Sequence, residues 1–270
     1  MNETKPINQN HLVHRKIKRP SLLKMALEAR SFFEAGSFAM SYPLLQTAPK
    51  GDGHPVMVMP GFLASDFSTK LLRTFLKSRG YKSYGWKLGR NLGKQSHPEK
   101  GCGPEIVARL KQIYRKHGQK VSLIGWSLGG IYARELAKMH PELTRQVITL
   151  GSPFNGSLKA NHASILFQKT SGYRFKDMCK HLRKNMKVAP PVPTTSIYSK
   201  TDGVTAWQCC LEKQDSTTQN IEVSSSHCGL GHHPFVMWVI ADRLAQNVNQ
   251  WRHFEPRKFE KLMFSCQEHA

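Results

Sequence analysis

Acidic residues are scarce in this chain of 270 residues. It has 18 Asp and Glu against 40 Lys and Arg, which gives a formal net charge of +22. A surface with this balance attracts anionic partners such as membrane head groups, nucleic acid or acidic substrates. The same charge is equally compatible with a basic surface that has no specialised partner.

Long apolar runs are absent, and we do not expect a conventional cleaved secretory signal. No stretch approaches the roughly 18 apolar residues that a membrane span needs. The first residues are polar and basic and lack an apolar h-region. We therefore expect a cytoplasmic protein, and peripheral contact of its basic surface with the anionic inner face of a membrane stays open.

Cysteine is too rare to form a disulfide scaffold, with six in the chain. The Cys and His spacings do not make a zinc site, so no metal is expected. Cys209, Cys210 and Cys228 flank motifs described below, and a disulfide among them stays open. We expect reduced thiols in a chain without an export signal. RNA-binding, helix-turn-helix and zinc-finger signatures are also missing, so no specific nucleic-acid partner is expected.

The sequence divides into a basic arm (1–20), a helical segment (21–50), an α/β domain (51–252) and a tail (253–270). Helical spacing of apolar residues predicts a helix from Ser21 to about Met40. The residues in this stripe are Leu22, Met25, Ala26, Ala29, Phe32 and Phe33. We expect the stripe to pack on the domain, and the alternative is an amphipathic membrane-surface element.

Short apolar runs alternate with amphipathic segments through the domain. Strands are expected at 56–59, 81–88, 121–124, 147–150, 195–198 and 221–223, and helices at 71–77, 105–117, 131–137 and 234–247. This alternation predicts a mostly parallel sheet covered by helices on both faces.

The alternation stops over residues 152–193. Between 155 and 190 there are eight Lys or Arg, with Asp177 the single acid. A long insertion without strands in an α/β domain is usually functional, so we expect a lid of helices and loops here.

The string Gly125-Trp126-Ser127-Leu128-Gly129 joins a predicted buried strand to a predicted helix. A sharp turn between the two would hold Ser127 on strained backbone and expose its hydroxyl. The flanking glycines leave room where side chains would collide. In this context the string predicts a nucleophilic serine.

An alcohol needs an adjacent base, and the base needs an orienting acid. His227 follows the last predicted strand among small residues, and His232 and His233 are its nearest competitors. Asp202 follows the preceding predicted strand and is the candidate acid. The alternative is that Asp202-Gly203 serves only to form a turn. The order Ser127, Asp202, His227 matches the nucleophile-elbow architecture.

An oxyanion hole requires two N–H donors beside the nucleophile. Leu128 follows Ser127 directly, and Phe62 lies in Pro60-Gly61-Phe62-Leu63 after an early strand, so their N–H groups are the candidates. Trp126 and Phe154 are the apolar candidates for an acyl pocket.

Together these motifs, with Gly151-Ser152-Pro153, resemble the α/β-hydrolase superfamily and its bacterial serine esterase/lipase-like members. The resemblance covers about residues 53–250 in the right order. It implies a Ser-Asp-His triad, an acyl-enzyme intermediate and no cofactor. Many relatives have His-Gly where Pro60-Gly61 stands here, and the basic arm and insertion are not part of the general pattern.

The sequence therefore predicts a serine hydrolase of carboxylic, lipid-like esters. An acyltransferase or an acyl-CoA thioesterase would use the same triad. A third alternative is a non-catalytic module that binds membranes or other anions on a hydrolase scaffold.

Overall fold

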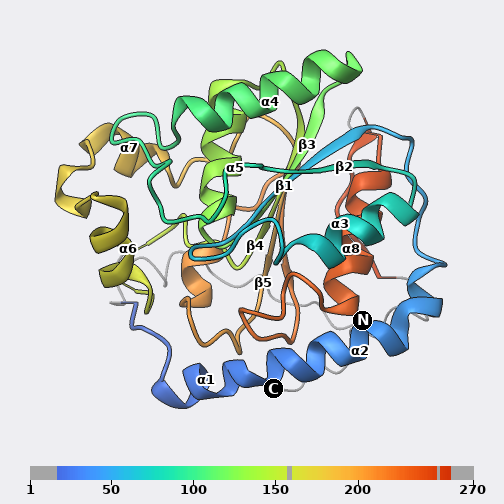
Figure 1. Ribbon diagram of the computed structural model, residues 1–270, viewed down its shortest axis with the longest axis horizontal. Coiled ribbons are helices and arrows are strands. Elements are labelled where there is room, and N and C mark those ends of the chain that lie inside the picture. The colour runs from blue at the N-terminus through green and yellow to red at the C-terminus, as the bar shows by residue number, and fades with distance from the viewer. Residues whose placement is uncertain (1–16, 157–159, 248–249, 257–270) are drawn as a thin grey trace, which may run out of the picture.

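A six-stranded sheet forms the centre of the molecule, in the order β2-β1-β3-β4-β5-β6 (Figure 1). The computed structural model describes residues 17–156, 160–247 and 250–256. The strands are β1 (Pro55–Met59), β2 (Lys82–Gly85), β3 (Val121–Trp126), β4 (Thr144–Leu150), β5 (Thr194–Tyr198) and β6 (Thr218–Glu222). All neighbouring strands are parallel, which confirms the predicted fold class.

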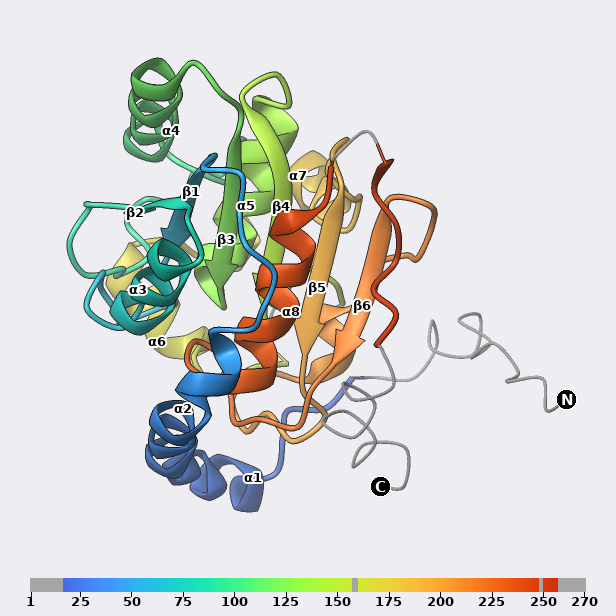
Figure 2. The ribbon, with the colours of Figure 1, turned by 90° about the vertical axis from the view of Figure 1, so that its right-hand side faces the viewer.

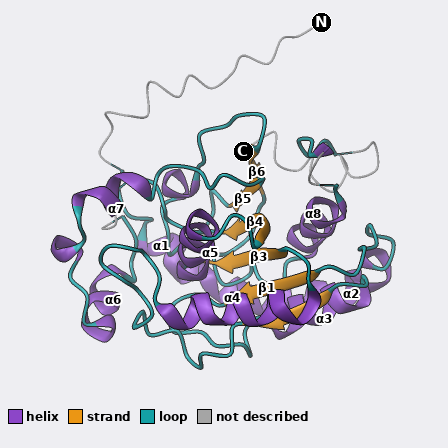
Figure 3. Cartoon of the chain, turned by 90° about the horizontal axis from the view of Figure 1, so that it is seen from above, coloured by secondary structure: helices purple, strands orange, loops and turns teal. Residues whose placement is uncertain are grey.

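Helices cover both faces of the sheet, as Figure 3 shows for α5 and α8. The helices α3 (Lys70–Ser78) and α8 (Pro234–Ala245) pack on one face, and α4 (Pro104–His117) and α5 (Leu128–Met139) on the other. Successive side chains of a strand point to opposite faces. Ile124 therefore joins one core and its neighbour Leu123 the other.

The strand order places a topological switch point beside β1. The chain runs from β1 to β2 on one side and then crosses to β3 on the other side of β1. In open α/β sheets, ligands bind outside the carboxyl ends of the strands at such a point. The loops that follow β1 and β3, with Phe62 and Ser127, are therefore in the expected place for a site.

The N-terminal helical segment comprises α1 (Leu22–Ala26), the 3₁₀ turn η2 (Leu27–Arg30) and α2 (Ser31–Leu45), and we call it the N-terminal belt. A helix here was predicted correctly, but its orientation was not. Every residue of the predicted apolar stripe is exposed. The belt packs on the domain through Phe38 and Leu45 and through its charged side chains.

The insertion between β4 and β5 contains α6 (Ser164–Ser171), the 3₁₀ turn η3 (Phe175–Asp177) and α7 (Lys180–Asn185). A further 3₁₀ turn, η4 (Trp207–Cys210), follows β5. Lys159, most of the predicted basic arm (1–16) and most of the predicted tail (257–270) lie outside the described residues. No helix within the described ranges is long and apolar enough to cross a membrane.

Candidate active site

Ser127 lies at the turn between β3 and α5, with φ 53° and ψ −119°. Positive φ is uncommon for a residue other than glycine and costs about 1–3 kcal/mol, so the surrounding structure must impose it. A hydrogen bond of 2.8 Å from the Ser127 N–H to the Leu150 carbonyl, at the end of β4, helps to fix the turn. This is the strained strand-to-helix turn predicted from the sequence.

The glycines around Ser127 are required by close packing. A Cβ on Gly125 would collide with the Gly129 carbonyl oxygen, and a Cβ on Gly129 would collide with the Met59 carbonyl oxygen at the end of β1. A Cβ on Gly61 would lie 3.2 Å from Ser127 Cβ. Ser127 is therefore packed directly against the loop that carries Phe62.

Asp202 and His227 form a buried pair at the carboxyl ends of β5 and β6. His227 Nδ1 donates to Asp202 Oδ2 at 2.6 Å, and the two residues are 6% and 3% exposed. Asp202 Oδ1 accepts from the N–H groups of Val204 and Thr205 at 2.8 and 2.7 Å. Asp202 thus orders its own turn with one oxygen and orients His227 with the other.

The environment of His227 raises its pKa above the usual 6.5. Burial of the ring opposes protonation, but the charge and hydrogen bond of Asp202 outweigh that effect, and Glu28 adds to it. A higher pKa makes the neutral His227 ring a stronger proton acceptor.

Gly151, directly after β4, is close to this pair. A Cβ on Gly151 would lie 3.1 Å from His227 Nδ1 and 3.2 Å from Asp202 Oδ2. Its φ of +55° also favours glycine. The sequence motif Gly151-Ser152-Pro153 therefore leaves room for the Asp-His pair.

Trp126 connects the serine turn to the histidine loop. Its Nε1–H donates to the His227 carbonyl at 3.0 Å, and its ring packs against the core. Among the described residues, no hydrogen bond joins Ser127 Oγ to the His227 ring. Such contacts often tighten only when substrate binds.

Glu28 of the N-terminal belt holds both loops of the Asp-His pair, and the sequence analysis did not anticipate this. Its Oε1 accepts from the N–H groups of Gly203 at 2.7 Å and His227 at 2.9 Å, and its Oε2 accepts from that of Cys228 at 2.9 Å. A carboxylate on an early helix carries no sequence signal for such a contact with loops that follow β5 and β6.

Glu34, two turns further along the belt, fixes the same loop. It accepts from the Ser226 N–H at 2.8 Å and from the Ser226 hydroxyl at 2.5 Å. Arg30 pairs with Glu34 at 3.3 Å and donates to the Thr201 carbonyl at 3.1 Å. The belt is therefore part of the support of the candidate site.

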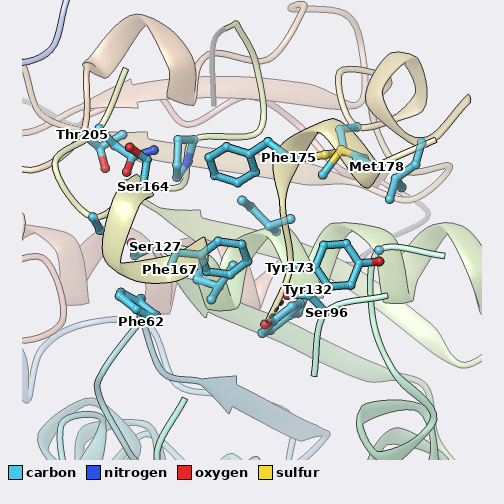
Figure 4. Close-up of a pocket in the computed structure, with 18 of the residues that line it drawn as sticks. Phe62, Ser96, Ser127, Tyr132, Ser164, Phe167, Tyr173, Phe175, Met178 and Thr205 are labelled. Carbon is cyan, nitrogen blue, oxygen red and sulfur yellow. Dashed lines mark hydrogen bonds between the residues drawn. The ribbon is translucent and has the colours of Figure 1, made fainter. Parts of the chain in front are cut away.

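An apolar cavity of about 790 Å³, its open mouth included, begins at Ser127 (Figure 4). Phe62 and Leu128, the predicted oxyanion-hole residues, line it. The insertion contributes Phe167, Tyr173, Phe175, Met178, Leu182 and Met186. The ring of Phe167 lies 5.8 Å from that of Phe62 and 5.7 Å from that of Phe175. The insertion thus forms much of the cavity wall.

Two predicted pocket residues lie elsewhere. Phe154 is 3% exposed and packs under the guanidinium of Arg134, at 3.6 Å from its ring centroid, and Pro153 lines the cavity instead. Trp126 supports the His227 loop, as described above, and is not part of the cavity wall. Both side chains are held by contacts away from the cavity, Phe154 by Arg134 and Trp126 by the His227 carbonyl, and the insertion supplies much of the wall instead.

A second Ser-His-Asp arrangement occurs at the opposite edge of the sheet. His54 contacts Asp52 Oδ1 at 2.5 Å and Ser122 Oγ at 2.8 Å. Ser122 and His54 are 0% and 1% exposed, so no substrate carbonyl can reach them. Burial lowers the pKa of His54, and we interpret the cluster as a link between β1 and β3.

Other chemistry is sparse in the described ranges. They contain no group of three or more His, Cys, Asp or Glu placed to hold a metal ion. No disulfide joins Cys209, Cys210 and Cys228. Seven basic residues of the insertion are exposed, and these are Lys169, Arg174, Lys176, Lys180, Arg183, Lys184 and Lys187.

A parallel sheet with a strained serine after β3 and an Asp-His pair after β5 and β6 has the arrangement of an α/β-hydrolase. Solved structures support the fold. Aspergillus fumigatus lipase B superposes with a TM-score of 0.54 at 17% identity, over 75% of this chain and 55% of that chain. The mature form of a Bacillus licheniformis lipase superposes with a TM-score of 0.52 at 18% identity, over 74% of this chain and 95% of that chain.

Sequence comparison gives shorter matches, and no family model matches the chain. Triacylglycerol lipases from Pseudarthrobacter phenanthrenivorans and Burkholderia plantarii are each 33% identical over 112 residues, or 38% of this chain. The matches span 34% and 30% of those lipases, about a third of their length. The chain therefore has the α/β-hydrolase fold, and part of its sequence is similar to triacylglycerol lipases.

Proposed function

We propose that this protein is a serine hydrolase of carboxylic esters with an apolar acyl group. The observation that carries the proposal is the position of Ser127, which opens into an apolar cavity at the same sheet edge as the buried Asp202–His227 pair. The similarity to triacylglycerol lipases supports the same class of substrate.

The proposed reaction has two steps. Ser127 Oγ attacks the ester carbonyl carbon while His227 Nε2 takes its proton, and His227 then returns that proton to the departing alcohol. A water molecule, deprotonated by His227, attacks the acyl-enzyme and releases the acid and Ser127. Asp202 keeps the His227 ring oriented and balances its charge.

The oxyanion of each tetrahedral intermediate would be held by the N–H groups of Phe62 and Leu128. Leu128 is the first residue of α5, and the first N–H groups of a helix have no acceptor within the helix. The positive end of the α5 dipole adds to this stabilisation. One such donor contributes roughly 10²–10³ in rate.

Acyl transfer is the second candidate, because the same intermediate can react with an alcohol or a thiol in place of water. The seven exposed basic residues of the insertion favour a phosphate-bearing acyl donor such as an acyl-CoA. Comparison of water, alcohol and thiol as acceptors of a trapped acyl group separates these reactions.

The nucleophile is tested with nitrophenyl esters of short and long acyl chains. We expect the Ser127→Ala variant to lose at least about 10³-fold in kcat, because a triad acts as a unit. A fluorophosphonate should label Ser127 in the wild type, as peptide mapping would show. Equal hydrolysis by the two proteins would refute the assignment and favour the non-catalytic binding module.

A further inference from the structure

The N-terminal belt presents large apolar side chains to solvent. Leu22, Phe32, Phe33 and Met40 are 74%, 81%, 83% and 86% exposed. The exposed positions between Ser21 and Thr47 include no charged residue. A surface helix normally directs its apolar side to the core and its charges to water. The belt has the reverse arrangement.

The charged residues of the belt all bond to the body of the protein. Glu28, Arg30 and Glu34 hold the loops of Asp202 and His227, as described above. Lys24 Nζ donates to the Lys200 carbonyl at 2.9 Å. The polar side of the belt is therefore used in attachment, which leaves the apolar side outward.

We propose that this outward face binds the surface of an anionic lipid bilayer. In such a complex the belt lies in the plane of the interface, with Phe32 and Phe33 at the boundary between head groups and acyl chains. α2 has 15 residues and carries its exposed apolar side chains along one side, which suits a helix that lies flat on a membrane.

Charge selects the bilayer as the occupant. Lys18 and Arg19 directly precede the belt, and both are exposed. These cations would meet phosphate head groups beside the inserted apolar side chains. The chain as a whole carries +22, so a second copy on this face would bring like charges together, whereas an anionic membrane is attracted.

The position of the belt relates the lipid surface to the candidate site. In Figures 1 and 2, α1 and α2 run along one edge of the molecule, below the carboxyl ends of β5 and β6. The His162 ring contacts the Pro20 carbonyl at 3.0 Å, so the residues just before the belt touch the insertion that forms much of the cavity wall. Docking would thus bring the sheet edge that carries Ser127 towards the lipid.

The experiment measures binding of the full chain to extruded vesicles, with phosphatidylcholine alone or mixed with phosphatidylglycerol. The Ser127→Ala protein is used, so the result does not depend on ester hydrolysis. We expect at least tenfold tighter binding to the anionic vesicles. Phe33→Glu should weaken that binding at least tenfold, because a carboxylate replaces an inserted ring.

Val188→Glu is the matched control, since Val188 is 55% exposed on the insertion, away from the belt, and the substitution changes the net charge equally. It should change vesicle affinity less than twofold. In a Ser127 background, Phe33→Glu should leave hydrolysis of a water-soluble ester unchanged.

If Phe33→Glu and Val188→Glu weaken vesicle binding equally, the proposal is overturned, because the net charge of the protein rather than the belt would then determine binding. Absence of vesicle binding by the wild type would also overturn it. So would a wild-type dimer that Phe33→Glu converts to a monomer, measured by light scattering, because the face would then belong to a second copy.

Discussion

In the proposed mechanism, the hydrogen bond between His227 Nδ1 and Asp202 Oδ2 controls the pH at which His227 acts as a base. The pKa of His227 is raised above 6.5, since Asp202 outweighs the burial of the ring. In the proposed mechanism the protonated His227 ring cannot accept the proton of Ser127, so kcat/KM should rise with pH to a plateau reached only above that pKa. In the Asp202→Asn variant, burial of the ring is opposed only by the charge of Glu28, so the pKa of His227 should fall.

Ring-proton NMR of the Ser127→Ala protein measures this pKa without turnover. His140 and Glu142 provide the matched control, because they pair at 3.0 Å at the opposite end of α5 from Ser127. Glu142→Gln should leave the midpoint of His227 unchanged. A midpoint of His227 that does not move in Asp202→Asn would contradict the assignment of Asp202.

Ser127, Asp202 and His227 were predictable because each follows a strand with a local signal of its own. The turn at Ser127 has its glycines, and parallel strands bring their carboxyl ends to one edge. Phe154 was wrong as a pocket residue because its burial under Arg134 depends on long-range packing. Short-range motifs predicted the candidate catalytic groups and the cavity residues Phe62 and Leu128, but not the part of the wall that the insertion forms.

At the scale of elements, the N-terminal belt should position the Asp-His pair through Glu28. Glu28→Ala leaves three N–H donors, of Gly203, His227 and Cys228, without their acceptor. The bonds of Gly203 and His227 are partly buried, and a buried donor without an acceptor costs about 1–3 kcal/mol, so we expect kcat to fall by about 10- to 100-fold with a smaller change in KM. Glu28→Gln retains one acceptor oxygen and should recover part of the activity.

Lys24→Ala is the control within the belt. The Lys24 side chain donates to the Lys200 carbonyl and not to the N–H groups that Glu28 holds. The Lys24→Ala variant should retain nearly full kcat. Fluorophosphonate labelling should slow in Glu28→Ala in step with kcat. If the loss of activity merely follows a loss of folded protein, as measured by circular dichroism, Glu28 has only a structural role.

The belt also shows what helical periodicity does and does not predict. The spacing of Leu22, Phe32 and Phe33 identified a helix, because that period is a local property of the chain. It did not show which side faces the core, since that depends on partners such as Ser226 and His227, about 190–200 residues away. The separations make these contacts invisible to any local pattern.

At the scale of the whole molecule, the central sheet has a core on each face. Leu123 and Ile124 are neighbours on β3 and both are 0% exposed. Leu123→Ala and Ile124→Ala should each lower the free energy of unfolding by about 2–5 kcal/mol, because each leaves a cavity in a packed core. The sequence predicted this arrangement, since strands buried on both faces appear as continuous apolar runs.

Phe33→Ala is the counterpart on the outward face of the belt. Phe33 is 83% exposed, so its removal should change the free energy of unfolding by no more than about 0.5 kcal/mol. Denaturant unfolding of the three variants, without lipid, measures the contrast. An equal loss of unfolding free energy in Phe33→Ala and Leu123→Ala would mean that the outward face of the belt is already buried in solution. The belt would then not be a free apolar surface that can bind a lipid bilayer.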